Sequence, residues 1–177
     1  YIVQPNSIVC AGTYGKTTTA ALMTWILKQN GFDPSYMFGG VSLNGIDSAS
    51  ISVLPPFRGE LEGGYSTSIK DLSVLEGDEY KTSRLDPRPK FAHYSPTHLL
   101  LTSVVWDHAD VYPTEESYVA AFQKLFDAVP ENGLRIISEK TIGILNPPLL
   151  VGAGARGEVQ CSTPSAPTTL TYGRDAS

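Results

Sequence analysis

The sequence has 177 residues, 41% apolar and 18% charged, a balance that favours one folded domain with a hydrophobic core. With a net charge of −5, no basic run and no apolar stretch of roughly 18 residues, it predicts neither a nucleic-acid partner nor a membrane partner. The first residues do not form a signal peptide and two cysteines make no disulfide framework, so we expect a cytoplasmic protein.

The first half of the chain begins with an apolar strand, a glycine turn and a helix. Residues 7–11 form the apolar run, and the helical composition extends from residue 16 or 17 to about 29, where Asn30 and Gly31 supply a stop. This helix is apolar nearly all round, which predicts burial between layers. A second short strand is expected to end near residues 39–40, and residues 51–54 predict either a loop or an edge hairpin.

Strands and helices continue to alternate in the second half. Residues 72–75, 98–105 and 134–137 predict strands, and between the last two Thr114 caps a helix that residues 130–133 end. The alternation predicts an α/β fold with a mostly parallel sheet flanked by helices. Residues 143–169 are rich in Pro, Gly, Ala and Ser and give no clear elements.

The glycine turn has the composition of a phosphate-binding loop. Glycines let backbone N–H groups converge on phosphate oxygens, and the helix that follows adds its positive N-terminal end. Lys16 can reach the phosphates and the Thr17 hydroxyl can bind Mg²⁺. A plain glycine turn is the alternative, but strand, loop and helix occur in the required order. We therefore expect ATP and Mg²⁺ as cofactors, with nucleotide bound by Gly12, Thr13, Tyr14, Gly15, Lys16, Thr17 and Thr18.

Two further polar elements follow predicted strands, where parallel sheets bind ligands. Glu76 ends the strand at 72–75, and a carboxylate there, facing a phosphate loop, is well placed to hold Mg²⁺. A solvated acidic turn is the alternative. Asp107 and His108 follow the strand at 98–105, and a histidine in such a place is either structural or a metal ligand.

Together these segments resemble the Mur ligase family. Residues 11–19 read Ala-Gly-Thr-Tyr-Gly-Lys-Thr-Thr-Thr, like the family's variant of the Walker A loop; the strict pattern fails because Cys10 replaces its first glycine. Residues 76–79 resemble the family's Glu-Ala-Asp-Glu motif, and residues 102–110 its Thr-Asn-x-Glu-x-Asp-His-x-Asp motif. The resemblance implies a P-loop-type central domain, with catalytic Lys16, Glu76 and His108 and with Thr17, Glu76 and His108 as metal ligands.

The run at 79–94 resembles the branch of the family that recycles murein tripeptide, although a charged surface loop would also explain it. The resemblance implies a ligase that joins L-alanyl-γ-D-glutamyl-meso-diaminopimelate to UDP-N-acetylmuramate through an acyl phosphate. The branch that adds L-alanine is the runner-up. We expect residues 1–177 to be a single but incomplete central domain, without the flanking domains that bind the UDP-sugar and the peptide, and inactive in ligation alone.

Three departures from the family pattern favour a different class, a nucleotide-binding module without ligase activity. Ser103 replaces the family's Asn and Val105 its Glu, and the Asn-Asp-Asp motif expected near Ser138 is not found. That alternative is opposed by the four retained residues Lys16, Thr17, Glu76 and His108. An unrelated P-loop kinase or hydrolase fits less well, because the loop begins Ala-Gly-Thr and an Asp-His element follows. The oligomeric state is left open.

Overall fold

The computed structural model describes residues 2–42, 45–52 and 71–145, and the backbone of 168–172. Across these ranges, seven strands form one sheet in the order β3-β2-β4-β1-β5-β6-β7. Neighbouring strands run parallel, apart from the antiparallel edge pair β2–β3. The elements are β1 (Asn6–Ala11), α1 (Lys16–Gln29), β2 (Ser35–Met37), β3 (Ala49–Ser50), β4 (Leu72–Gly77), the 3-10 helix η1 (Lys90–His93), β5 (His98–Leu101), α2 (Glu115–Asp127), β6 (Leu134–Ser138), α3 (Glu139–Ile142) and β7 (Thr168–Tyr172).

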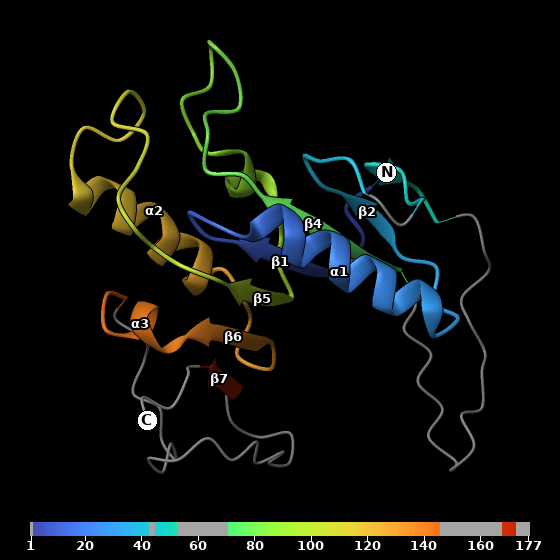
Figure 1. Ribbon diagram of the computed structural model, residues 1–177. Helices are drawn as coiled ribbons and strands as arrows, with labels where there is room; N and C mark the ends of the chain where they lie inside the picture. The colour runs from blue at the N-terminus through green and yellow to red at the C-terminus, as the bar shows by residue number, and fades with distance from the viewer. Residues whose placement is uncertain (1, 43–44, 53–70, 146–167, 173–177) are drawn as a thin grey trace.

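The central strand β1 divides the core in two, because successive side chains of a strand point to opposite faces of the sheet. Cys10 packs in a cluster with Ala20 of α1, whereas Val9 belongs to a second cluster with Tyr118 and Phe122 of α2. Helix α1 therefore covers one face of the sheet and α2 the other, and Figure 1 shows α1 lying across β1 and β4. The mostly parallel α/β fold predicted from the sequence is confirmed.

Both predicted ends of α1 and the predicted start of α2 are confirmed, whereas α2 ends at Asp127, before the predicted stop at residues 130–133. Helix α1 begins at Lys16 and ends at Gln29, followed by Asn30 as the C-cap. Thr114 caps α2: its hydroxyl accepts a hydrogen bond from the Ser117 N–H at 3.2 Å, and the Ser117 hydroxyl accepts one from the Thr114 N–H at 3.3 Å. This reciprocal pair satisfies two of the donors that a helix N-terminus leaves without intrahelical partners.

The prediction that α1 is buried between layers was wrong. Only Ala20 and Thr24 are buried on this helix, while Leu22 is 52% and Ile26 42% exposed. A helix on one face of a sheet turns about half of its surface away from that sheet. Among the described residues, nothing covers that outer side, and so its apolar side chains face outward.

Three strand boundaries also differ from the prediction. β5 ends at Leu101 and not at Val105, because Ser103 and Val105 form hydrogen bonds to the loop residues Thr13 and Tyr14 and not to a neighbouring strand. β2 ends at Met37, two residues earlier than expected. The edge pairing falls at β3, before the 51–54 run, whose last two residues lie outside the described ranges.

Little of the unassigned 143–169 segment falls in the described ranges. The short helix α3 ends at Ile142, just before it, and β7 lies parallel to β6 at its far end. Within the part of the chain that the structure describes, no helix combines the length and apolar content that a membrane crossing needs.

Candidate functional site

The turn between β1 and α1 needs glycine at two positions. Gly12 has φ +132° and Gly15 has φ +82°, backbone conformations that side-chain-bearing residues rarely adopt. At Gly12 the space is closed as well, because an added Cβ would lie 2.2 Å from the Thr102 hydroxyl oxygen and 2.8 Å from the backbone of Ser103. The loop therefore packs directly on the segment that follows β5.

The N-terminus of α1 is left open to an anion. Gly15 occupies the N-cap position, no side chain caps the helix and no acidic residue lies in its first turn. The first N–H groups of an α-helix have no intrahelical partner, and the helix dipole places partial positive charge there. This is the arrangement that binds phosphate groups in other proteins.

Residues 102–105 hold the loop in place by hydrogen bonds. The Thr13 N–H donates to the Ser103 carbonyl at 2.9 Å, and the Tyr14 N–H donates to the Ser103 hydroxyl at 3.1 Å. The Thr13 hydroxyl donates to the Val105 carbonyl and accepts from the Val105 N–H, both at 2.9 Å. Ser103 therefore supports the loop through its side chain, whereas Val105 does so only through its backbone and leaves its side chain 51% exposed.

Glu76 lies at the carboxyl end of β4, beside the start of α1. Its register partner on β1 is Cys10, so the carboxylate reaches the same sheet edge as the loop. One carboxylate oxygen accepts a hydrogen bond from the Thr17 hydroxyl at 2.7 Å and the other accepts one from the Gly39 N–H at 2.5 Å. Glu76 and Thr17, both predicted as metal ligands, are thus in direct contact.

Lys16 and His108 meet at a residue that the sequence did not single out. Lys16 Nζ donates to Glu79 Oε1 at 2.9 Å and to the Thr13 carbonyl at 3.3 Å, and His108 Nε2 lies 3.1 Å from the same Glu79 oxygen. The Glu79 side chain is fully buried, and its second oxygen has no hydrogen-bond partner among the described residues. The predicted site residues therefore form two groups: Thr17 with Glu76, and Lys16 with His108 around Glu79.

The position of His108 is set by its backbone and its neighbours. Its φ of +57° is in the left-handed region, a cost of the kind that functional sites often carry. The His108 N–H donates to the Asp107 carboxylate at 2.7 Å, and the Tyr80 ring lies 4.3 Å from the imidazole, centre to centre. The backbone hydrogen bond to Asp107 and the ring contact with Tyr80 thus hold His108 where its imidazole meets Glu79.

Aromatic residues of the α2 side connect the core to this site. The Tyr118 hydroxyl lies 2.9 Å from the Thr13 hydroxyl, and the Tyr112 hydroxyl donates to the Glu79 carbonyl at 2.6 Å. The two rings pack edge to face, 5.0 Å apart. Burial, the largest cause in both cases, raises the pKa of each phenol above its ordinary value, so both keep the proton they donate.

A divalent cation would find a partial ligand set here. Mg²⁺ in nucleotide sites commonly uses one or two protein oxygens together with phosphate oxygens and waters. The Thr17 hydroxyl and the Glu76 carboxylate fit that pattern, and the buried Glu79 oxygen without a partner is a second anion nearby. No group of three or more acidic, His or Cys residues in the described ranges could hold a metal alone.

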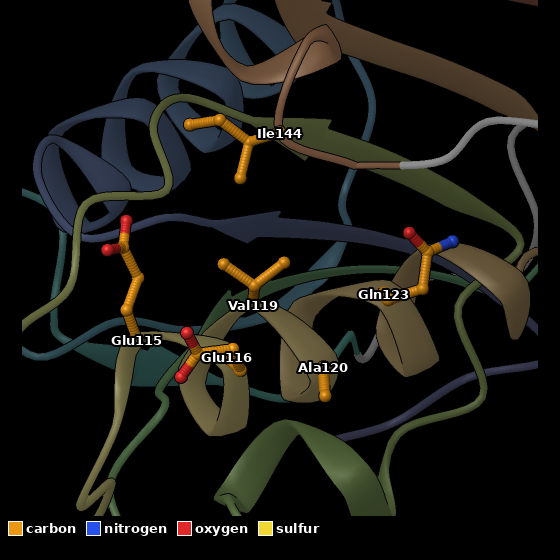
Figure 2. Close-up of a pocket in the computed structure, with 6 residues that line it drawn as sticks. All are labelled: Glu115, Glu116, Val119, Ala120, Gln123 and Ile144. Atoms are coloured by element: carbon orange, nitrogen blue, oxygen red, sulfur yellow. The ribbon is translucent and has the colours of Figure 1, made fainter.

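The described cavity lies elsewhere, on the outer side of α2. It has a volume of about 430 Å³ and is lined by Glu115, Glu116, Val119, Ala120, Gln123 and Ile144 (Figure 2). None of the site residues predicted from the sequence lines it. The charged side chains are instead concentrated at the loop between β1 and α1, where Lys16, Glu76 and Glu79 lie near the open N-terminus of α1.

Comparison with known proteins gives the family of this fold and loop. The family model for the Mur ligase middle domain matches residues 10–144. The chain belongs to the Mur ligase family. It is 37% identical over 137 residues to the UDP-N-acetylmuramate–L-alanyl-γ-D-glutamyl-meso-2,6-diaminoheptandioate ligase of Escherichia coli K12, covering 77% of this chain and 26% of that protein.

Two other relatives are an L-alanine ligase and a further tripeptide ligase. A UDP-N-acetylmuramate–L-alanine ligase of Renibacterium salmoninarum is 32% identical over 176 residues, covering 99% of this chain and 30% of the relative. The crystal structure of the UDP-N-acetylmuramate:L-alanyl-γ-D-glutamyl-meso-diaminopimelate ligase of Neisseria meningitidis superimposes with a TM-score of 0.62 at 32% identity, covering 78% of this chain and 40% of that one. The chain thus spans about a quarter to a third of the length of these curated ligases.

Proposed function

We propose that this chain forms the ATP- and Mg²⁺-binding part of a ligase that joins L-alanyl-γ-D-glutamyl-meso-diaminopimelate to UDP-N-acetylmuramate in the cytoplasm. The observation that carries the proposal is the convergence of Lys16, Thr17 and Glu76 at the uncapped N-terminus of α1. The family membership and the relatives that carry out this reaction support it.

The reaction divides into two steps. The terminal phosphoryl group of ATP passes to the muramate carboxylate, giving an acyl phosphate and ADP. The peptide amine then attacks the acyl carbon, an amide bond forms and inorganic phosphate leaves. In this proposal Lys16 and the helix end bind phosphate oxygens and stabilise the charge of the transferred group. Mg²⁺, when bound, would neutralise part of that charge, with Thr17 and Glu76 as its protein ligands.

His108 has a less direct place in the proposal. Its imidazole contacts Glu79 and not Glu76, so a ligand role would require a cation shared with Glu79. The loop residues Gly12, Thr13, Tyr14, Gly15 and Thr18 would contribute through the loop and the first turn of α1. Thr13 and Tyr14 already donate their N–H groups to Ser103, which leaves the later part of the loop for phosphate.

Nucleotide binding is the first test, because it needs only this part of the protein. Calorimetry with ATP and excess Mg²⁺ should give saturable binding, and Lys16→Ala should weaken it about 10–100-fold through loss of a charge-assisted contact. Lys28→Ala is the matched control, since Lys28 lies at the far end of the same helix in a partly buried ion pair with Asp33 at 3.3 Å. Equal affinity of wild type and Lys16→Ala would refute the assignment.

A nucleotide-binding module without ligase activity is the second candidate, favoured by Val105 and by the Ser138–Thr141 region. Val105 gives the loop no side-chain support, and the Ser138 hydroxyl lies 3.1 Å from that of Thr141 where the family motif would place acidic residues. The protein expressed with the flanking parts of its gene should be incubated with ATP, Mg²⁺, UDP-N-acetylmuramate and either tripeptide or L-alanine. Mass spectrometry of the products separates the two ligase branches, and failure with both amines supports the second candidate.

A further inference from the structure

Glu79 is the one fully buried carboxylate among the described residues of the site, and no role follows for it from the phosphate loop pattern. Its side chain is completely shielded from solvent, whereas Lys16 and His108 retain 17% and 22% exposure. A carboxylate removed from water needs hydrogen bonds and an opposite charge to stay ionised. Lys16 supplies the charge at 2.9 Å, and His108 adds a contact at 3.1 Å.

The contacts to Glu79 satisfy only one of its two carboxylate oxygens. Both contacts fall on Oε1, and Oε2 is buried without a hydrogen-bond partner in the described part of the chain. Lys16 must also serve the phosphate groups of a nucleotide. Its ammonium group has three N–H donors, of which one points to the Thr13 carbonyl and one to Glu79, so a single donor remains.

The Lys16–Glu79 ion pair therefore affects which form of a nucleotide the loop can attract. A polyphosphate that reaches Lys16 also approaches the buried charge of Glu79, and two like charges repel strongly at short range inside a protein. A divalent cation bound to the nucleotide offsets this repulsion, because the cation is attracted both by the Glu79 carboxylate and by the phosphates. The same carboxylate thus opposes metal-free nucleotide, whereas for the metal complex its attraction to the cation and its repulsion from the phosphates largely cancel.

We propose that Glu79 is a specificity-determining residue that makes this site select metal-complexed nucleotide over the metal-free form. The inference rests on the proposed function, since it assumes that the loop binds a nucleotide. Glu76 differs from Glu79 in this respect. Its partners are the neutral Thr17 hydroxyl and Gly39 N–H, as suits a direct metal ligand, whereas Glu79 is paired with the phosphate-binding cation itself.

The backbone of Glu79 has a separate, structural task. Its carbonyl accepts the Tyr112 hydroxyl at 2.6 Å, and that bond survives any change of side chain. Substitutions at Glu79 therefore test the carboxylate. Glu79→Gln and Glu79→Ala remove the charge, with and without a hydrogen-bond acceptor, and Glu79→Asp keeps the charge on a shorter side chain.

The experiment compares the dissociation constant of ATP in excess EDTA with that in excess Mg²⁺, by calorimetry on the 177-residue chain. Glu79→Gln should bind ATP in EDTA about tenfold more tightly than wild type and change little in Mg²⁺, so that the ratio of the two constants falls about tenfold. Glu79→Asp should keep a ratio close to wild type. Thermal unfolding of each variant checks that it is folded, and Glu79→Ala replaces Glu79→Gln if the amide prevents folding.

Asp78→Asn is the matched control, because it removes one negative charge from the adjacent residue. Asp78 is paired at the surface with Lys90 at 2.5 Å, and its substitution should leave the ratio within about twofold of wild type. An unchanged ratio in the folded charge-removing variant overturns the inference. So does equal weakening in EDTA and Mg²⁺, which would mean that Glu79 only holds Lys16 in place. If wild type binds no ATP in Mg²⁺, the proposed function itself fails.

Discussion

The two faces of the sheet differ in how they are built. On the α2 face, a continuous cluster of large side chains joins β1, β4, β5, η1 and α2, with Phe91, Tyr118, Phe122 and Phe126 all almost completely buried. On the α1 face the buried cluster is small, and Leu22 and Ile26 of the helix point outward. One face holds most of the apolar burial, and the other presents the helix whose N-terminus forms the site.

The difference indicates that the α2 face mainly stabilises the fold, whereas the start of α1 mainly serves ligand binding. The loop between β1 and α1 is held by hydrogen bonds to residues 102–105 and to Tyr118. Tyr112 connects the same aromatic cluster to Glu79. Substitutions within the α2 face should therefore affect mainly the free energy of unfolding, and substitutions at the start of α1 mainly the affinity for ligand.

The largest effect is expected from emptying the centre of the α2 face. Phe122 is fully buried and its ring lies 5.4 Å from Phe91 and 5.0 Å from Tyr118, centre to centre. Phe122→Ala should lower the free energy of unfolding by about 3–5 kcal/mol, because it removes apolar burial and leaves a cavity. Urea denaturation followed by circular dichroism measures the change.

Leu22→Ala on the outer side of α1 provides the comparison, since Leu22 is an apolar residue that is 52% exposed. Its cost should stay below about 1 kcal/mol. Similar costs for the two variants would contradict the asymmetry between the faces and would mean that the outer side of α1 is covered in solution.

A smaller, pH-dependent effect is expected on the α1 face, at Cys10. Burial first, and the charge of Glu76 second, raise the pKa of the Cys10 thiol from 9.0 to about 12. The thiol then ionises in the unfolded chain before it does in the folded one, so its contribution to stability is complete below pH 9 and is lost as the pH rises toward 12. The difference in the free energy of unfolding between wild type and Cys10→Ala should therefore change by about 1.4 kcal/mol per pH unit above pH 9. The change favours the alanine variant.

Parallel urea titrations at pH 8, 9 and 10 would measure that difference, because all other titrating groups are shared by the two proteins. A constant difference across this range would show that the thiol is accessible to water or that the local structure opens before it ionises.

The sequence predicted the elements of this fold better than the contacts between them. Strand, loop and helix around Lys16 follow from local signals, namely an apolar run and glycines, and the start of α2 follows from the Thr114 cap. All of these hold in the structure. The role of Glu79 does not follow from such signals. Glu79 belongs to the same acidic motif as Glu76, but only the fold shows that it lies beyond the end of β4, buried between Lys16 and His108, which are distant in the chain.

The burial of α1 was misjudged for a related reason. Its composition shows that the helix is apolar but not which of its sides a second layer covers. Likewise, residues 102–105 have the apolar and polar mixture of a strand end, and it is the hydrogen bonds to Ala11 and Thr13 that turn them into a support for the loop.

The smallest expected effect tests the connection between the two faces. The Tyr118 hydroxyl contacts the Thr13 hydroxyl at 2.9 Å, so that the aromatic cluster and the loop between β1 and α1 share one hydrogen bond. Tyr118→Phe keeps the ring in the core and removes only this bond. Thr13 retains both of its bonds to Val105, so no buried hydroxyl is left unsatisfied. The free energy of unfolding should therefore fall by only about 1 kcal/mol.

The informative measurement is the affinity for ATP and Mg²⁺ in the same variant. If the bond helps to fix the loop, Tyr118→Phe should weaken binding about threefold, although residue 118 lies outside the loop. Tyr36→Phe is the matched control: Tyr36 is a buried tyrosine on the α1 face, and its ring stacks with Phe38. Its affinity should equal that of wild type. Equal affinities for all three proteins would separate the core from the site and leave residues 102–105 as the support of the loop.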